Sequence, residues 1–393
     1  MLDIASFLRM LVVFWLGLPI AIFALYGCII VYYNKFKKTE SPDSSEHKEN
    51  LIQTKFEPDV SVVIATHNEE LIISKKIENL LALDYPREKL EIIFADDSDD
   101  STPDIIMEYT KKYPFVNLLR FNERMGYSPS MIEGCKKAKG EIIVLGDAGS
   151  FLDSHAIRHF VLHFQGPAIG AVTGQDVILN LNEGVGSSEN LYQRVYNFLR
   201  TAESRMDSTF FIKGEATAAR SSLIKDLEHC SATFDTAVGL FLRQKGYRTV
   251  YDPQVKFYEY APLTHSDRVK QKTIRAANLI RIIFSFRHLM FKRKYGKYGS
   301  VILPMYFGMV AIAPVSILIG FLFLLPATFL DFGFGAIIWS IAGMAVLISL
   351  LFSRNLLRTF IDFEKSLLKA LYEILIHKAH DKIDKVGSTR RIQ

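Results

Sequence analysis

Three long stretches of the sequence carry no charged residue. The first covers residues 10–34 and exceeds the roughly 20 residues that a helix needs to cross a hydrocarbon core of roughly 30 Å. The other two, residues 298–330 and 332–353, are separated only by Asp331. These stretches predict an amino-terminal transmembrane helix and a later transmembrane hairpin. A secretory signal peptide is the alternative for the first stretch, although its apolar part should be shorter and end in small residues.

The pattern of apolar and polar positions changes between these stretches. Residues 60–65, 90–95 and 141–146 are short apolar runs, which are typical of strands buried on both faces of a sheet. Residues 69–83 and 103–112 fit helices, so strands and helices alternate along the chain. That order predicts an α/β domain with a mainly parallel sheet. In such a sheet, ligands bind beyond the carboxyl ends of the strands.

Polar segments follow all three predicted strands, at residues 66–70, 96–100 and 147–150. One acidic turn of this kind is commonly a helix cap. Three of them at one edge of a sheet instead indicate a ligand site. The sequence has neither a P-loop motif nor a GxGxxG fingerprint, so it supports neither a P-loop NTPase nor a dinucleotide-binding Rossmann protein.

Composition agrees with a membrane protein that carries a folded domain. Of the 393 residues, 49% are apolar, and the mean hydropathy is +0.14. With 23% charged residues and a net charge of only +5, the chain does not have the composition of a disordered protein. Cys28, Cys135 and Cys230 are widely spaced, which excludes a disulfide framework and a thiolate zinc site.

Basic residues gather next to the predicted membrane segments. Lys35, Lys37 and Lys38 follow the first span, and residues 268–297 contain ten Lys or Arg interleaved with apolar residues. By the positive-inside rule these flanks lie in the cytosol, so the amino terminus lies outside. The position of the basic stretch directly before a span favours anionic lipid as its partner over nucleic acid.

Together these patterns predict six regions along the chain. They are a transmembrane helix (1–34), a linker (35–58), a cytosolic α/β domain (59–266), basic interfacial amphipathic helices (267–297), a transmembrane hairpin (298–353), and an amphipathic helix with a basic tail (354–393).

Six segments inside the domain occur in an informative order: SVVIATHNEE, FADDSDDST, VLGDAGS, FIKGEATAAR, ATFDTAVGLFLRQKGYRTVYDP and EYAPLTHSDRVKQKTIRAA. In this order they resemble the family 2 glycosyltransferases, inverting enzymes of the GT-A fold that use nucleotide-sugar donors. The resemblance covers about residues 59–277, and the membrane arrangement resembles polysaccharide synthases of the cellulose and hyaluronan synthase type. It implies that the α/β domain has the GT-A fold.

The resemblance implies roles for four residues on the donor side. Thr66, Asn68 and Glu69 would line the nucleotide pocket, and Asp97 would contact the base. Carboxylates suit a reaction that must hold a ribose and base and deprotonate an acceptor hydroxyl.

Asp147 stands at the first acid of the family's DxD motif, which helps to hold a divalent cation, Mn²⁺ or Mg²⁺, across the diphosphate. The sequence departs from this motif because Gly149 occupies the second acidic position. The alternative role for Asp147 is a cap at a strand-to-helix turn.

Asp235 stands at the catalytic base of the family, although Phe234 replaces the acid that usually precedes it. The alternative role for Asp235 is to stabilise a helix amino terminus. By the same resemblance, Gly214, Glu215 and Arg220 lie on the acceptor side, with Gly214 allowing close backbone approach. Arg220 has an alternative as well, a surface ion pair.

The last motif departs from the family's QxxRW pattern. Here Gln271 and Arg275 lie in QKTIRA, with one extra residue and Ala276 in place of Trp. Arg275 would still meet the donor diphosphate together with Gln271. The absent indole removes a stacking surface for an acceptor sugar, which puts processive synthesis in doubt.

The resulting hypothesis is a membrane-embedded inverting glycosyltransferase in the plasma membrane with a cytosolic catalytic domain. It would move a sugar from a nucleotide-diphospho-sugar, a UDP-sugar, to a surface glycan, a polysaccharide or a lipid-linked acceptor. Association of several chains stays open. The alternative is a catalytically inactive nucleotide-sugar sensor or assembly partner, suggested by the departures at Gly149, Phe234 and Ala276.

Overall fold

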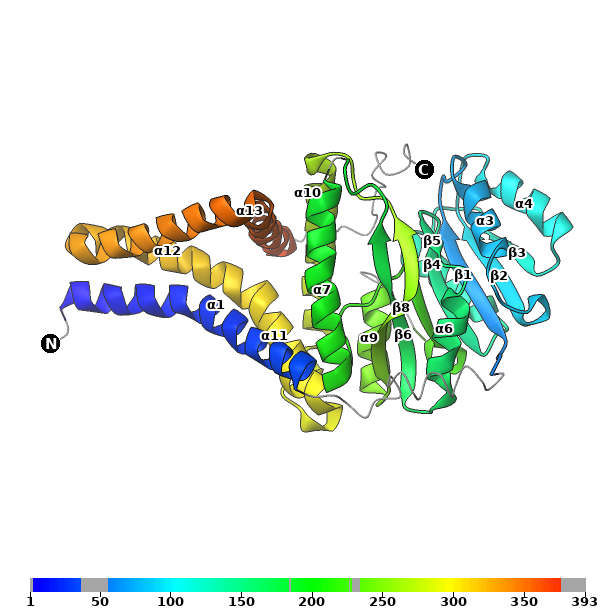
Figure 1. Ribbon diagram of the computed structural model, residues 1–393, viewed down its shortest axis with the longest axis horizontal. Coiled ribbons are helices and arrows are strands. Elements are labelled where there is room, and N and C mark those ends of the chain that lie inside the picture. Colours follow the sequence, from blue (N-terminus) through cyan, green and yellow to red (C-terminus); the bar gives the residue numbers. More distant parts are fainter. Residues whose placement is uncertain (1–2, 37–55, 184, 226, 228–233, 376–393) are drawn as a thin grey trace.

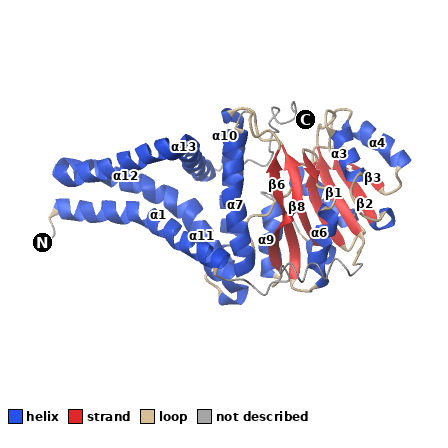
Figure 2. Ribbon diagram, viewed as in Figure 1, coloured by secondary structure: helices blue, strands red, loops and turns tan. Residues whose placement is uncertain are grey.

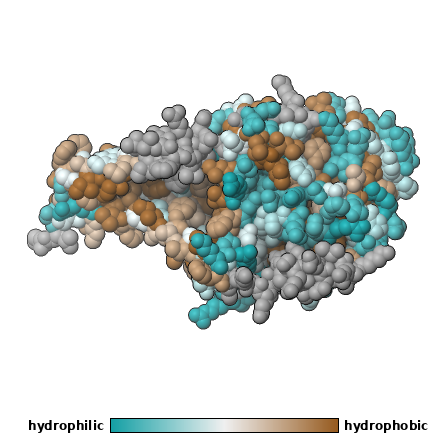
Figure 3. All heavy atoms as spheres, in the orientation of Figure 1, coloured by the Kyte–Doolittle hydropathy of each residue, from teal (hydrophilic) through white to brown (hydrophobic). Residues whose placement is uncertain are grey.

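Long helices project from one side of the molecule, and an α/β domain forms the other side (Figures 1 and 2). The structure is a computed structural model that describes the chain apart from residues 1–2, 37–55, 184, 226, 228–233 and 376–393, and apart from the side chains of 188, 345–360 and 373–375. Hydrophobic residues gather over the projecting helices, whereas hydrophilic residues cover most of the visible face of the α/β domain (Figure 3).

The helices and strands alternate through the middle of the chain. The helices are α1 (Ile4–Lys35), α3 (Ile73–Leu81), α4 (Thr102–Lys112), α5 (Tyr127–Lys137), α6 (Ala156–Leu162), α7 (Gly186–Met206), α8 (Ser221–Ile224), α9 (Phe234–Gln244), α10 (His265–Ser285), α11 (Leu303–Phe307), α12 (Ala313–Leu330) and α13 (Phe332–Leu375). The strands are β1 (Val60–Thr66), β2 (Leu90–Asp96), β3 (Val116–Arg120), β4 (Ile142–Asp147), β5 (Ser150–Leu152), β6 (Ile169–Ile178), β7 (Ala216–Arg220) and β8 (Arg248–Glu259).

The strands form one mixed sheet in the order β3-β2-β1-β4-β7-β6-β8-β5. The first four strands pair in parallel, and β6 also pairs in parallel with β8. By contrast, β7 pairs antiparallel with both β4 and β6, and β5 pairs antiparallel with β8. The predicted α/β class and mainly parallel sheet are therefore confirmed.

The three strands predicted from apolar runs are confirmed as β1, β2 and β4. The helix predicted over residues 103–112 is confirmed as α4, whereas the helix expected from residue 69 begins at Ile73. The reason is a turn before α3, in which the amides of Ile72 and Ile73 both donate to the Glu69 carbonyl. This turn leaves the segment after β1 free to form part of the sheet edge where ligands bind.

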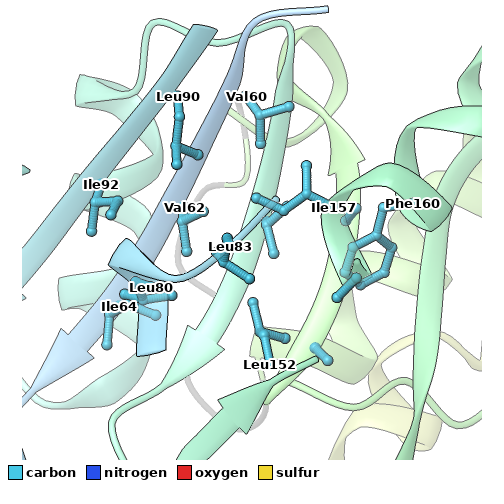
Figure 4. Close-up of a cluster of buried hydrophobic side chains, with 14 of the residues drawn as sticks. Val60, Val62, Ile64, Leu80, Leu83, Leu90, Ile92, Leu152, Ile157 and Phe160 are labelled. Atoms are coloured by element: carbon cyan, nitrogen blue, oxygen red, sulfur yellow. The ribbon is translucent and has the colours of Figure 1, made fainter. Parts of the chain in front are cut away.

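Side chains along β1 point alternately to the two faces of the sheet and contribute to a hydrophobic core on each face. Val60, Val62 and Ile64 face a cluster that includes side chains of α3 and α6 (Figure 4). Val63 faces the opposite cluster, which includes side chains of α5 and α9. Strands buried on both faces read as continuous apolar runs, and this is the pattern that the sequence shows.

Two helical segments are long and apolar enough to cross a membrane, α1 and the stretch from Tyr298 to Leu330. The second stretch alternates between α-helix and π-helix, and Pro304 and Pro314 lie at the first turns of α11 and α12. Wider π turns accommodate residues that lack an N–H, which explains why the prolines do not end the helix.

The second half of the predicted hairpin and the tail are only partly described. The turn at Asp331 lies between α12 and α13 as expected, and α13 then continues to Leu375 without a helix boundary at residue 353. The third span, residues 332–353, stays a prediction because side chains from 345 onward fall outside the described part. Most of the predicted linker, 37–55, and the tail, 376–393, also fall outside it.

α7 and α10 stand between the projecting helices and the sheet (Figure 1). The basic segment predicted to lie on lipid contains α10, whose Ala277, Ile280 and Ile283 are buried. Part of this segment is therefore packed inside the protein. Its contact with lipid stays a prediction, and exposed Arg287, Lys292 and Arg293 after α10 are the residues available for it.

Candidate active site

Strand register brings the predicted site residues to one edge of the sheet. Thr66 pairs with Asp96 across β1 and β2, while Ala65 pairs with Asp147 across β1 and β4. The Thr66 hydroxyl donates to Asp96 at 2.7 Å, and Arg120 donates to the other Asp96 oxygen at 2.7 Å. Asp96 is thus engaged in holding the strand ends together.

Asp97 organises the loop beyond β2. One carboxylate oxygen accepts from the amide of Gly126 at 2.8 Å, and the other lies 2.9 Å from His67 Nδ1. Gly126 has a φ of 88°, a left-handed conformation that favours glycine, and it precedes α5. Asp97 therefore fixes both His67 and the start of α5.

Asn68 and Glu69 follow on the neighbouring loop after β1. Asn68 has a φ of 55°, which asparagine tolerates better than most residues, and its side-chain oxygen accepts from the Asp99 amide at 2.9 Å. The Glu69 amide donates to the Thr102 hydroxyl at 2.8 Å, which also links this loop to the start of α4. The structure thus brings Thr66, Asn68, Glu69 and Asp97 together at one end of the sheet.

A tight turn carries Asp147 from β4 into β5. Asp147 Oδ1 accepts from the Gly149 amide at 2.8 Å, and the Ser150 carbonyl accepts from Lys76 Nζ at 2.6 Å. Lys76 is completely buried on α3. A buried ammonium behind the turn holds its backbone in one position.

Asp235 lies in the first turn of α9 and approaches Gly214 from the other side of the site. A Cβ atom on Gly214 would lie 3.3 Å from Asp235 Oδ2 and 2.9 Å from the Tyr127 hydroxyl. Only glycine leaves room for this approach without a shift of the neighbours. The structure therefore brings Asp235, Gly214 and Tyr127 into direct proximity.

Burial and, after it, the negative charge of Glu215 raise the pKa of Asp235 to about 6, against the lowering effects of the Thr236 amide and the charge of Arg275. Burial also raises the pKa of Tyr127 well above its usual value, with contributions from the charges of Asp235, Asp147 and Glu215. Three carboxylates thus act on one phenol. A carboxyl with a pKa close to neutrality in such surroundings is typical of a catalytic acid or base.

α10 delivers Arg275 to this group of acids. Arg275 lies 3.6 Å from Glu215 Oε1 and keeps 59% of its side chain exposed. Gln271 lies one helical turn earlier and is partly buried, so both residues share a face of α10. The structure therefore places Arg275 next to the site, and Gln271 lies next to Arg275 on the same face of α10.

A second layer of buried charges continues from the site between β6, β8 and α7. Lys213 lies 2.9 Å from Asp176 Oδ2, and Arg200 lies 3.1 Å from Asp176 Oδ1. Burial raises the pKa of Glu259 to about 8, in spite of the charge of Lys213. Glu259 pairs with Ser150 across β8 and β5, so this layer touches the turn that contains Asp147.

Lys272 and Glu189 extend the charged layer between α7 and α10. Lys272 lies 3.3 Å from Glu189, and its ammonium stands 3.3 Å from the centre of the Tyr192 ring. Burial lowers the pKa of Lys272 to about 8. Burial would raise the pKa of Glu189, but the charges of Lys272 and Arg268 hold it below its usual value.

The prediction for Arg220 is wrong in its position. Arg220 pairs with Ile142 at the amino end of β4, whereas Ala216 pairs with Gly146 next to Asp147. Its guanidinium donates to the carbonyls of Phe164, Gly166 and Ile169. Because β7 runs antiparallel to β4, Arg220 lies at the edge of the sheet opposite the site. The hydrogen bonds of its guanidinium go to backbone carbonyls and not to a surface acid, which was the predicted alternative.

A divalent cation fits the site if a bound phosphate completes its ligands. The carboxylates of Asp147, Glu215 and Asp235 concentrate negative charge around Tyr127, and hard cations take carboxylate and phosphate oxygens. Within the described part of the chain, no group of three His, Cys, Asp or Glu side chains is arranged to hold a metal by itself. The protein would therefore supply Asp147, and the phosphate would supply the rest.

Comparisons with known proteins agree with this geometry. The sequence profile described as "Glycosyltransferase like family 2" matches residues 58–277. The chain is 27% identical over 218 residues to the poly-beta-1,6-N-acetyl-D-glucosamine synthase of Staphylococcus epidermidis, covering 54% of this chain and 52% of that protein. It is 28% identical over 253 residues to the probable glycosyltransferase YdaM of Bacillus subtilis, covering 60% and 59%. The chain therefore spans little more than half the length of these curated relatives.

A solved structure resembles most of the chain. The mannosyltransferase PcManGT from Pyrobaculum calidifontis, determined with GDP-Man and Mn²⁺, matches with a TM-score of 0.71 and 22% identity over 93% of this chain and 100% of that one. This similarity confirms the predicted GT-A fold. Because the family profile covers more than half of the residues, the chain belongs to glycosyltransferase family 2.

Proposed function

We propose that the chain is a membrane-embedded inverting glycosyltransferase. It moves a sugar from a nucleotide-diphospho-sugar, a UDP-sugar, to a surface glycan, a polysaccharide or a lipid-linked acceptor at the cytosolic face of the membrane. The observation that carries this proposal is the position of Asp235 next to Gly214 and Tyr127, where burial and the nearby Glu215 raise its pKa to about 6. The name of the S. epidermidis relative supports a polysaccharide among these acceptors.

Asp235 acts as the general base in this proposal. With a pKa of about 6, about ten carboxyls in eleven are ionised at pH 7, yet the group is far more basic than an ordinary aspartate. It takes the proton of the acceptor hydroxyl while that oxygen bonds to the anomeric carbon. The bond from this carbon to the diphosphate oxygen breaks on the opposite face, so the configuration inverts and a nucleoside diphosphate leaves.

Arg275 stabilises the negative charge that develops on the leaving diphosphate. Its exposed guanidinium now faces Glu215 at 3.6 Å, and a charge-assisted bond to phosphate oxygens would replace part of that contact. Gln271 would donate from the same face of α10. A divalent cation bound at Asp147 would add Lewis-acid stabilisation to the same oxygens.

The loops after β1 and β2 form the proposed nucleotide pocket. Thr66, Asn68, Glu69 and Asp97 lie together there, with Asn68 and Asp97 held by backbone amides. Asp97 would contact the base, as proposed from the family resemblance. These loops change little on binding if their hydrogen bonds persist, which keeps the pocket preorganised.

The membrane arrangement supports an acceptor that is presented at the lipid surface. The two apolar helical segments and the sheet lie on opposite sides of α7 and α10, and α10 carries Arg275 of the site (Figure 1). By the positive-inside rule, the domain faces the cytosol and the amino terminus lies outside. Anionic membrane lipid would contact the basic residues that follow α10.

The test is the release of nucleoside diphosphate by the purified full chain, assayed against a panel of nucleotide sugars with native lipid, with and without Mn²⁺ or Mg²⁺. The key variant is Asp235→Asn. The matched control is Asp104→Asn, which removes an exposed carboxylate from the first turn of α4, just as Asp235 stands in the first turn of α9.

We expect Asp235→Asn to retain donor binding and lose at least about 10³-fold in kcat, within the range by which general bases accelerate reactions. Asp104→Asn should behave like the wild type. Equal losses in the two variants would assign Asp235 to helix stabilisation. Donor binding without turnover in the wild type, for every donor and acceptor lipid, would instead support the inactive sensor or assembly partner.

A further inference from the structure

Glu203 is a buried carboxylate that the proposed reaction does not use. It lies on α7 with no exposed surface. The hydroxyls of Tyr26 on α1 and Tyr306 on α11 both donate to Glu203 Oε1 at 2.6 Å. Because Tyr26 and Tyr306 belong to the two different apolar helical segments, one carboxylate oxygen ties both segments to the catalytic domain.

The other carboxylate oxygen points to the backbone that leads into the site. Glu203 Oε2 accepts from the Phe210 amide at 2.9 Å and from the Thr209 hydroxyl at 3.2 Å. A few residues later, the Lys213 amide donates to the Thr173 hydroxyl at 2.9 Å. Glu203 and Thr173 thus fix the two ends of a short segment that continues into Gly214 and Glu215.

Aromatic rings close this site to water. Tyr306 stacks on Phe210 at 4.2 Å between ring centres and meets Tyr26 edge to face at 5.8 Å. Burial raises the pKa of Glu203, although its hydrogen bonds with Tyr26, Tyr306, Phe210 and Thr209 lower it. A buried carboxylate is costly unless its donors are all in place, so it permits one arrangement of the surrounding elements.

Apolar contacts alone would hold α1 and α11 against the domain without fixing their position this closely. A carboxylate with four donors from three separate parts of the chain ties their positions to one another. If α1 or α11 shifts, Oε1 loses a donor and Glu203 must move or rotate. Any such movement is passed to Phe210 through Oε2.

We propose that Glu203 is a positioning residue, through which the two apolar helical segments set the placement of residues 209–215 and thereby of Gly214 and Glu215 at the active site. Transfer then depends on how α1 and α11 are packed, and a disturbance in the membrane segments changes the rate of transfer. The proposal rests on the proposed function for the role of Gly214 and Glu215 in catalysis.

Tyr26→Phe and Tyr306→Phe test the proposal because each keeps the ring and removes one donor to Glu203. The matched control is Tyr298→Phe. Tyr298 is 1% exposed in the same apolar cluster, and among the described residues its hydroxyl has no hydrogen-bond partner. The control therefore removes a buried hydroxyl from the same cluster without removing a hydrogen bond to Glu203.

We expect kcat to fall about tenfold in Tyr26→Phe and in Tyr306→Phe, equal to about 1.4 kcal/mol, while the KM for the donor changes less than about twofold. Tyr298→Phe should keep wild-type kcat and KM. Equal kcat values in all three variants would overturn the proposal. A loss of kcat that merely follows a loss of folded protein would do the same.

Hydrogen exchange of the full chain in lipid nanodiscs provides a readout that needs no turnover. Loss of either tyrosine hydroxyl should speed exchange at the Phe210 amide about tenfold and leave the amides of β4 unchanged. Faster exchange throughout the sheet would show general destabilisation and refute the coupling. If the exchange result holds but the wild type transfers no sugar, the proposed function fails and the mechanical link through Glu203 stands.

Discussion

Glu215→Gln should make the proposed enzyme less sensitive to acid. The charge of Glu215 is the second-largest cause that raises the pKa of Asp235, after burial. Glutamine keeps the size of the side chain and removes the charge, and it also releases Arg275 from its ion pair at 3.6 Å. Both effects favour the ionised form of Asp235, so its pKa should fall.

The size of the change follows from the shift of Asp235. A rise from the ordinary aspartate pKa of about 3.9 to about 6 corresponds to about 3 kcal/mol against ionisation. Burial is the largest cause and Glu215 the second, so we take about 1 kcal/mol, about a third of this cost, as the effect of removing the Glu215 charge. At pH 5, about 9% of Asp235 is ionised in the wild type, against about one third in the variant. The ratio of activity at pH 5 to activity at pH 7 should therefore rise about threefold to fourfold.

The assay is kcat/KM for the donor between pH 5 and pH 8, because this quantity reports the pKa of the free enzyme. The ratio between two pH values removes any loss of absolute activity that the variant suffers at the acceptor side. Asp104→Asn provides the control and should keep the wild-type profile. An acidic limb that stays in place or moves to higher pH in Glu215→Gln would refute the electrostatic account of Asp235.

Two further predictions concern stability and metal use. The folded pKa of Asp235 is raised to about 6, so its ionisation opposes folding, and this cost grows as pH rises from about 4 to 6 and stays constant above pH 7. Asp235→Asn should therefore raise the free energy of unfolding by about 1–2 kcal/mol at pH 8 and leave it unchanged at pH 4. Denaturation at the two pH values measures this. An equal gain in the free energy of unfolding at pH 4 and pH 8 would contradict the prediction. Lys76→Met removes the ammonium behind the Asp147 turn and should raise the Mn²⁺ concentration for half-maximal activity about tenfold, a loss of about 1.4 kcal/mol. Exposed Lys136→Met is its control, and equal Mn²⁺ requirements in the two variants would remove this role from Lys76.

Residues that end or directly follow parallel strands were predictable from the sequence. Thr66 and Asp147 end β1 and β4, and Asp97 directly follows β2; parallel strands bring their carboxyl ends to one edge regardless of the details of packing. Asp235 was predictable in its local structure as well, because a helix followed by Gly246 and then β8 is readable from the residue pattern. Their catalytic roles came from family resemblance.

Residue positions in the antiparallel half of the sheet could not be predicted from the sequence. The segment FIKGEATAAR begins at the site, but five residues of β7 span about 17 Å, so Arg220 lies at the other edge. Nothing in the pattern of β7 reveals its direction. Tyr127 was not predicted as a site residue because its only local signal is the preceding Gly126. Lys213 and Glu259 were not predicted either, because only the long-range pairing of β6 with β8 brings them near the site.

The turn at Asp147 has a consequence for how the nascent chain matures. Only Ala148 and Gly149 separate β4 from β5, yet β5 pairs with β8, so Ser150 meets Glu259 more than a hundred residues later in the sequence. During translation, the strands of the parallel half of the sheet are synthesised long before β8. A partly synthesised chain therefore contains the four parallel strands β3, β2, β1 and β4 before β5, next to Asp147, gains the strand that it pairs with.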